Sequence, residues 1–147
     1  MNYVHIHLAI NHSPLYTTLF AFFILLAGVV RRNRTLVNTA LVIAIIAALC
    51  AIAADLTGDQ ASDIIDHSAP IAGVDKTLIH EHDLAAGFAV TSACICGGVA
   101  LIAFFFRRRW LEILLLVLLA WSFSVIARTA LLGGRIHHPE TRPVVSG

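Results

Sequence analysis

The amino-acid sequence predicts an all-α integral membrane protein, a four-helix bundle in which residues 1–147 form a single domain. Composition and the spacing of apolar residues both point to this fold class. Hydrophobic residues make up 59% of the chain and charged residues only 13%, whereas a soluble domain has about 25% charged residues. The apolar residues also gather in four long runs. A run inside hydrocarbon must satisfy its own backbone groups, so each run is expected to be a helix.

The first membrane helix is expected at residues 14–31. Ser13 can accept a hydrogen bond from the unpaired amides of the first turn, and Pro14 suits the first helical position. Because spanning takes about 20 apolar residues, this run is short unless residues 4–10 extend it. An arginine-rich turn follows the run.

The second membrane helix is expected at residues 35–55, closed by Asp55 and the Thr57-Gly58 pair. Residues 59–67 are polar but amphipathic, with isoleucines that can dip toward the bundle while aspartates stay in water. We therefore expect a short amphipathic helix in this long outer loop, lying over the mouth of the bundle and ended by Pro70 and Gly73.

The third membrane helix is expected at residues 78–106 and the fourth at residues 109–132. The third would reach about 45 Å if it began at Lys76, against roughly 30 Å of hydrocarbon, so its first two turns should project from the membrane. The Gly133-Gly134 pair is expected to end the fourth helix and to let a histidine-bearing tail, residues 133–147, turn back over the outer face.

The basic residues predict the orientation of the bundle. Six of the ten Lys and Arg residues lie in the two short turns, and eight of the nine acids lie on the other side. This bias places both turns in the cytoplasm. Both termini and the long loop are then expected on the periplasmic side of a bacterial inner membrane. A cleaved signal peptide would carry its basic residues before the apolar run, but here they follow it.

Several functional classes are disfavoured by the same residues. Basic residues confined to juxtamembrane turns give no support to nucleic-acid binding. Cys50, Cys94 and Cys96 lie inside apolar helices, where small buried thiols are the ordinary interpretation. Two cysteines two residues apart are about 200° apart around a helix, so Cys94 and Cys96 cannot readily chelate one ion. No nucleophile–base–acid arrangement stands out, so no independent catalytic activity is expected.

Every histidine in the chain falls on the predicted outer side. Three sequence-distant segments contribute them: His5, His7, His12, His67, His80, His82, His137 and His138. A one-sided cluster of imidazoles beside apolar helices predicts a site for haem or for a transition metal.

The third helix carries two of these histidines on opposite faces. His82 shares a face with the small residues Ala86, Ala89 and Ala93, and small residues mark the packing side of a membrane helix. We therefore expect His82, and not His80, to point into the bundle.

Four short motifs carry a resemblance to a known family. They are His7 with Asn11-His12-Ser13-Pro14, Thr57-Gly58-Asp59-Gln60-Ala61 with His67, Ile79 with His82-Asp83, and His138-Pro139-Glu140 with Arg142. Together they span nearly the whole chain and resemble a family of small four-helix bacterial inner-membrane proteins without an assigned activity. The resemblance implies functional roles at the matched positions and leaves His5, His80 and His137 as additions. It supports the topology and implies no reaction.

Haem b is the first hypothesis for the histidine cluster, since haem needs one or two axial imidazoles and an apolar slot. His12 and His82 could face each other across the bundle, while His67 and His138 serve a second haem or cap the first. Cofactor-binding residues are thus predicted at His7, His12, His67, His82, His138 and Arg128. Arg128 lies about one turn inside the outer end of its helix, where it can meet a haem propionate, snorkel outward or pair with Asp55.

The predicted function is that of a membrane electron-transfer subunit. All histidines lie at one face, so a haem there would exchange electrons with quinol, a periplasmic cytochrome c or a larger respiratory complex. The first alternative is a copper or zinc site built from His12, His82, His67 and His138 with acidic neighbours. Met1 is the only methionine, which disfavours a soft Cu(I) carrier. The second alternative is a cofactor-free structural subunit of a larger membrane complex.

Overall fold

The computed structural model describes residues 3–66 and 76–137, and this part of the chain is helical without strands. The helices are α1 (Tyr3–Ile10), α2 (Ser13–Val30), α3 (Arg34–Asp66), α4 (Lys76–Phe106) and α5 (Arg109–His137). The all-α prediction is confirmed for these residues.

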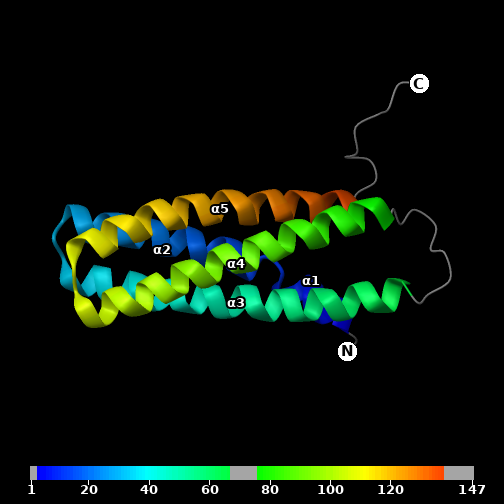
Figure 1. Ribbon diagram of the computed structural model, residues 1–147, viewed down its shortest axis with the longest axis horizontal. Helices are drawn as coiled ribbons and strands as arrows, with labels where there is room; N and C mark the ends of the chain where they lie inside the picture. Colours follow the sequence, from blue (N-terminus) through cyan, green and yellow to red (C-terminus); the bar gives the residue numbers. More distant parts are fainter. Residues whose placement is uncertain (1–2, 67–75, 138–147) are drawn as a thin grey trace, which may run out of the picture.

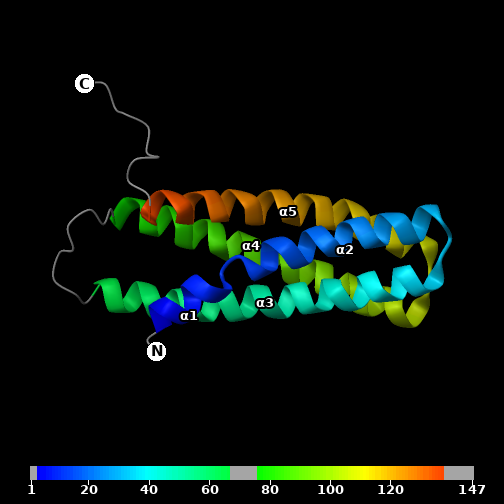
Figure 2. The ribbon, with the colours of Figure 1, turned by 180° about the vertical axis from the view of Figure 1, so that it is seen from behind.

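Helices α2 to α5 form a four-helix bundle in which each helix packs against two neighbours, in the order α2, α3, α4, α5 and back to α2. The two tight turns lie together at one end of the bundle, and α1 packs against α3 toward the other end (Figures 1 and 2).

The bundle has the length and the surface of a multi-pass membrane protein. Four segments are long and apolar enough to cross a bilayer: His5–Val30, Arg34–Asp63, Lys76–Phe106 and Arg109–Ile136. Large apolar side chains cover the outside, including Phe20, Phe23, Phe88, Phe105 and Val117. In water such a surface would be a liability, but against lipid tails it is the expected exterior.

Pro14 explains why the first span is made of two helices. Proline has no amide hydrogen, and its ring clashes with the carbonyl four residues earlier, here that of Ile10. The chain therefore turns at residues 11–12, and Ser13 Oγ donates a hydrogen bond to Ile10 O at 2.6 Å. As the sequence suggested, α1 extends the short first run.

Two helices are longer than the sequence led us to expect. Helix α3 does not end near Asp55 but continues to Asp66, so residues 59–66 are its last turns and not a separate amphipathic helix. Helix α5 likewise continues through Gly133-Gly134 to His137. A glycine inside a helix costs only about 1 kcal/mol relative to alanine, so packing can override it.

The two helical hairpins share several residues at a spacing of 75. Helices α3 and α5 begin at Arg34 and Arg109, and the turns before them contain Arg32 and Arg107, both with φ of 51°. Identical residues at equivalent positions include His5 and His80, His7 and His82, Arg32 and Arg107, Arg34 and Arg109, and Gly58 and Gly133. Since α2 corresponds to α4 and α3 to α5, the repeats are related by an approximate twofold axis along the bundle.

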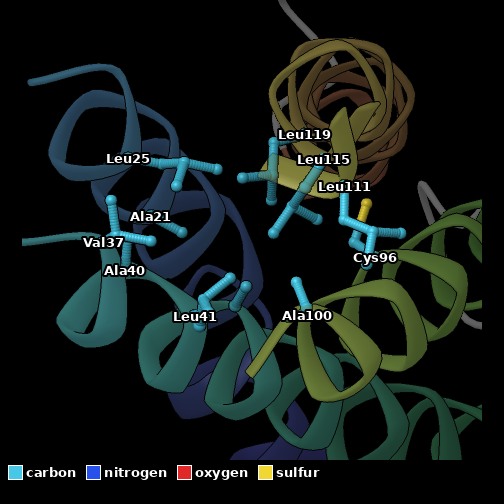
Figure 3. Packing of buried hydrophobic residues seen from close by; sticks show 12 residues of the cluster. Ala21, Leu25, Val37, Ala40, Leu41, Cys96, Ala100, Leu111, Leu115 and Leu119 are labelled. Carbon is cyan, nitrogen blue, oxygen red and sulfur yellow. The ribbon is translucent and has the colours of Figure 1, made fainter. Parts of the chain in front are cut away.

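The buried residues of the two repeats also correspond to each other, but a large side chain in one repeat stands where the other repeat has a small one. Fully buried Leu25 corresponds to fully buried Ala100, while Ala40 corresponds to Leu115. These residues gather around the centre of the bundle near the turns (Figure 3). Equal large residues at both positions would overfill the axis, so the exchange of size lets two similar hairpins interlock.

Small residues bring neighbouring helices into close contact. An added Cβ at Gly97 of α4 would lie 2.7 Å from Ala48 Cβ of α3, and one at Gly28 would lie 2.8 Å from Val37 N. Between apolar helices in lipid, association depends on close van der Waals packing, because lipid tails are as apolar as the side chains. Gly97 and Ala48 thus mark the contact that joins the two hairpins.

Replacing Gly97 with alanine should therefore separate α3 from α4. We expect Gly97→Ala to lower the free energy of unfolding by about 1–3 kcal/mol, as overpacking does. Gly98→Ala is the matched control, because nothing lies within 4 Å of its added Cβ. The control should be neutral or slightly stabilising through helix propensity. Thermal unfolding in detergent, followed by circular dichroism, measures both; equal stability of the two variants would contradict the close contact.

Candidate functional site: a histidine-lined cavity

A cavity of about 430 Å³ opens at the end of the bundle opposite the two tight turns. Helices α1, α3, α4 and α5 contribute most of its walls, and Pro14 of α2 lies beside it. The lining is mainly apolar and small, with alanines and glycines from α3, α4 and α5, into which three imidazoles and three aspartates project. Ligand and cofactor sites commonly occupy about 300–1,000 Å³ and combine apolar walls with a few polar groups.

His7 enters the cavity from α1 and is held by α3. Its Nδ1 lies 2.9 Å from Ala54 O and 3.4 Å from Thr57 Oγ1. Gly58, one turn after Ala54, leaves room for the ring: an added Cβ there would lie 3.1 Å from His7 Cε1. Gly58, which interrupts the apolar pattern of α3, thus leaves the space that the ring of His7 occupies.

His82 repeats this arrangement on α4 and α5. Its Nδ1 lies 3.1 Å from Thr129 O, and an added Cβ at Gly133 would lie 3.1 Å from His82 Cε1. In each repeat the histidine precedes its carbonyl partner by 47 residues. Thr129 also donates from Oγ1 to Ala85 O at 3.1 Å, which fixes α5 against α4 beside the ring.

These hydrogen bonds determine the tautomer of both rings. A carbonyl oxygen only accepts, so Nδ1 of His7 and Nδ1 of His82 must each carry the hydrogen. In the neutral imidazole the lone pair then belongs to Nε2. Histidines that ligate a metal are typically held in this way, with one ring N–H donated to a carbonyl or carboxylate and the other nitrogen bound to the metal.

The two rings lie close to each other across the cavity. Their centroids are 6.5 Å apart and their planes make an angle of 78°. This is the geometry of an edge-to-face aromatic contact, and the rings are close enough that one metal ion could be held by both.

Acidic and amide side chains surround the imidazole pair. Asp55 and Asp59 of α3 and Asp83 of α4 line the cavity, and Ser62 Oγ donates to Asp83 Oδ2 at 3.0 Å. Asn11 and His12 line it from the break between α1 and α2, where His12 Nδ1 is hydrogen-bonded to Asn11 Oδ1. This wall is therefore polar and negatively charged, unlike the alanine-lined floor.

The structure brings some of the predicted site residues together. His7, His12 and His82 line the cavity, and His82 points inward as expected, while His80 is exposed. The ring that lies nearest His82 is His7, not His12 as we had proposed from the sequence. The reason is the break at residues 11–12, which leaves the ring of His12 exposed at the rim. His67 and His138 lie outside the described residues.

Arg128 occupies a different position from the imidazoles. It is exposed on α5 and is not among the residues that line the cavity. Its contact with a haem propionate stays a prediction.

The sequence did not reveal the carbonyl and the glycine that hold each imidazole ring, nor the pairing of His7 with His82. The signal that could have found them is the comparison of the chain with itself at a shift of 75 residues. That comparison aligns His7 with His82, and it aligns Gly58 with Gly133, the glycines that leave room for the two rings.

Comparisons with known proteins do not extend this picture: no family model matches the chain, and no curated protein or solved structure is significantly similar to it. The family resemblance drawn from the motifs therefore stays an expectation. Within residues 3–66 and 76–137, no group of three or more His, Cys, Asp or Glu side chains is arranged to hold a metal ion. The site is defined by two imidazoles and the cavity between them.

Because the ring of His82 lies directly against Gly133, alanine at this position should displace the ring. We expect Gly133→Ala to weaken the hydrogen bond from Nδ1 to Thr129 O and to mix the two tautomers, because the added Cβ is closer than ordinary van der Waals contact. Gly134→Ala is the matched control, with nothing within 4 Å of its Cβ. Nitrogen-15 spectra of labelled histidines report the tautomers; a single Nδ1–H tautomer in both variants would show that the glycine is dispensable.

Proposed function

We propose that the protein is a membrane electron-transfer subunit that binds haem b in this cavity, with His7 and His82 as the residues that would hold it. The observation that carries the proposal is the 6.5 Å separation of two imidazoles whose Nδ1 atoms are both bonded to helix carbonyls. Haem requires only one or two protein ligands, because the macrocycle supplies the remaining four nitrogens. Two imidazoles from different helices of a bundle meet that need.

The residues of the cavity fit the cofactor in further ways. Apolar side chains such as Ala51, Ala89 and Ile126 line the cavity, and they suit a macrocycle. The carbonyls of Ala54 and Thr129 orient the rings, and a carbonyl that accepts from Nδ1–H also makes Nε2 a better donor to the metal. When bound, haem b supplies one-electron redox chemistry, with its electron exchanged at this end of the bundle. Quinol, a periplasmic cytochrome c or a larger respiratory complex are the proposed partners.

The proposed location is the bacterial inner membrane, with the histidine cavity on the periplasmic side and the arginine turns in the cytoplasm. The support is the positive-inside bias of the sequence, together with a fold that brings both arginine turns to the end opposite the cavity. We expect alkaline phosphatase fused after residue 147 to be active in a bacterial host, and green fluorescent protein at the same point to be dark. The reverse pattern would invert the orientation.

A metal ion without a macrocycle is the second candidate, and the acidic wall favours it. Asp55, Asp59 and Asp83 line the same cavity as the imidazole pair, and carboxylates beside neutral imidazoles suit copper(II) or zinc. In this candidate an aspartate would have to move toward the imidazoles to complete the ligand set, because no such group of three is arranged among the described residues. Metal binding then replaces electron transfer. A cofactor-free structural role is the remaining alternative.

The visible spectrum of the detergent-purified full chain separates these candidates. We expect a sharp α-band after reduction with dithionite, and a pyridine haemochrome count equal to the amount of protein. His7→Ala and His82→Ala should each abolish the low-spin spectrum, because each removes one of the two imidazoles that would hold the haem.

The internal repeat supplies the controls for this experiment. His5→Ala and His80→Ala remove the equivalent histidines two residues earlier, which do not line the cavity, and should keep the band. A colourless protein would contradict the haem proposal. Elemental analysis of the same sample then tests the second candidate, which requires copper or zinc that is lost in His82→Ala and kept in His80→Ala.

A further inference from the structure

The end of the bundle that carries the two turns holds a second cavity, of about 220 Å³. Both turns and the beginnings of α3 and α5 form its walls. Four arginines and one acid provide its charged lining: Arg32, Arg34, Arg107, Arg109 and Glu112. We call it the arginine pocket.

The arginine pocket carries a strong excess of positive charge. Four guanidinium groups stay charged at any physiological pH, and Glu112 is the single carboxylate among the residues that line the pocket. Glu112 is buried and forms an ion pair with Arg34 through Nη1. Three positive charges are left for another partner.

Arg34 also has unused hydrogen-bonding capacity inside this pocket. Its Nε and Nη2 atoms are buried and have no hydrogen-bond partner within the described residues, while Nη1 is bonded to Glu112. A buried donor without an acceptor costs free energy. The planar fork of a guanidinium matches the oxygens of a phosphate, so an oxyanion in the pocket would satisfy these donors.

The backbone around the pocket supports the same ligand chemistry. Helices α3 and α5 both begin here, and the positive ends of their dipoles add to the potential. Arg32 and Arg107 both have φ of 51°, in the left-handed region that favours glycine. Each turn nevertheless places an arginine there, which brings two pocket side chains to equivalent positions on either side of the approximate twofold axis.

We propose that the arginine pocket binds a phosphate group, carried either by the headgroup of an anionic lipid or by a free phosphate compound. The proposal is independent of the histidine cavity and of any haem. Arginines that serve only as a topology signal need to lie near the membrane surface, but they need no pocket and no buried unpaired donors. Basic pockets between membrane helices are a known setting for anionic headgroups.

The chain offers a matched pair of double variants for the test. Arg32→Gln with Arg107→Gln removes two charges from the pocket, whereas Arg31→Gln with Arg108→Gln removes two charges from exposed positions of the same turns that do not line it. Native mass spectrometry of the full chain, in micelles containing phosphatidylglycerol or phosphatidylcholine, counts bound lipid. Titration calorimetry with inorganic phosphate forms the second arm.

We expect saturable binding that favours phosphatidylglycerol, weakened about tenfold or more in the pocket variant and less than about threefold in the control, as loss of charge-assisted hydrogen bonds implies. If lipid binds and inorganic phosphate does not displace it, the ligand is the lipid headgroup. If inorganic phosphate binds and displaces the lipid, the ligand is a free phosphate compound.

Equal weakening in both double variants would overturn the proposal, because it would reduce the effect to general surface charge. Absence of saturable binding in both arms would overturn it as well. If the pocket variant loses the helical circular dichroism of the parent, Arg107→Gln alone compared with Arg108→Gln alone gives the same decision.

Discussion

Close approach of helix backbones is the constraint on which the rest of this structure depends. In lipid, burying an apolar side chain gains little over leaving it against acyl chains, so the helices must gain from tight mutual packing. The buried residues are accordingly dominated by alanine, and Gly97 of α4 lies directly against Ala48 of α3. A bundle packed this tightly has little interior space. Among the described residues one cavity lies at each end, lined by histidines at one end and by arginines at the other.

The duplicated hairpin explains how such a small chain builds two axial sites. A side chain near the approximate twofold axis is met by its counterpart from the other repeat, so one histidine pattern yields a pair of imidazoles and one arginine turn yields a four-arginine pocket. The repeats differ at several positions near the axis. Leu25 faces the axis in one repeat where Ala100 stands in the other, and Glu112 stands where the first repeat has Val37.

Much of the fold could be read from the sequence, because long apolar runs leave the backbone no alternative to helices. The ends of α3 and α5 could not, since glycine is a weak helix breaker and the local pattern does not reveal that Gly58 and Gly133 each face an imidazole. For the site, the inward direction of His82 followed from its stripe of alanines. The pairing with His7 did not follow, because it depends on how far Pro14 turns α1 across α3. The ion pair of Arg34 with Glu112 joins residues 78 apart, a distance at which sequence spacing carries no information.

The twofold relation has a consequence for any flat ligand held between His7 and His82. After a half-turn about the axis, such a ligand meets the same two imidazoles and the same two glycines beneath them, so these four residues cannot tell its two faces apart. Discrimination falls to the rest of the lining, where Asp55 and Asp59 of the first repeat correspond to Ala130 and Gly134 of the second. Asn11 and His12, at the proline break, likewise correspond to Ala86 and Gly87 in an unbroken helix. A ligand with one polar edge would thus be bound in a preferred orientation, with that edge toward the polar side chains of the first repeat.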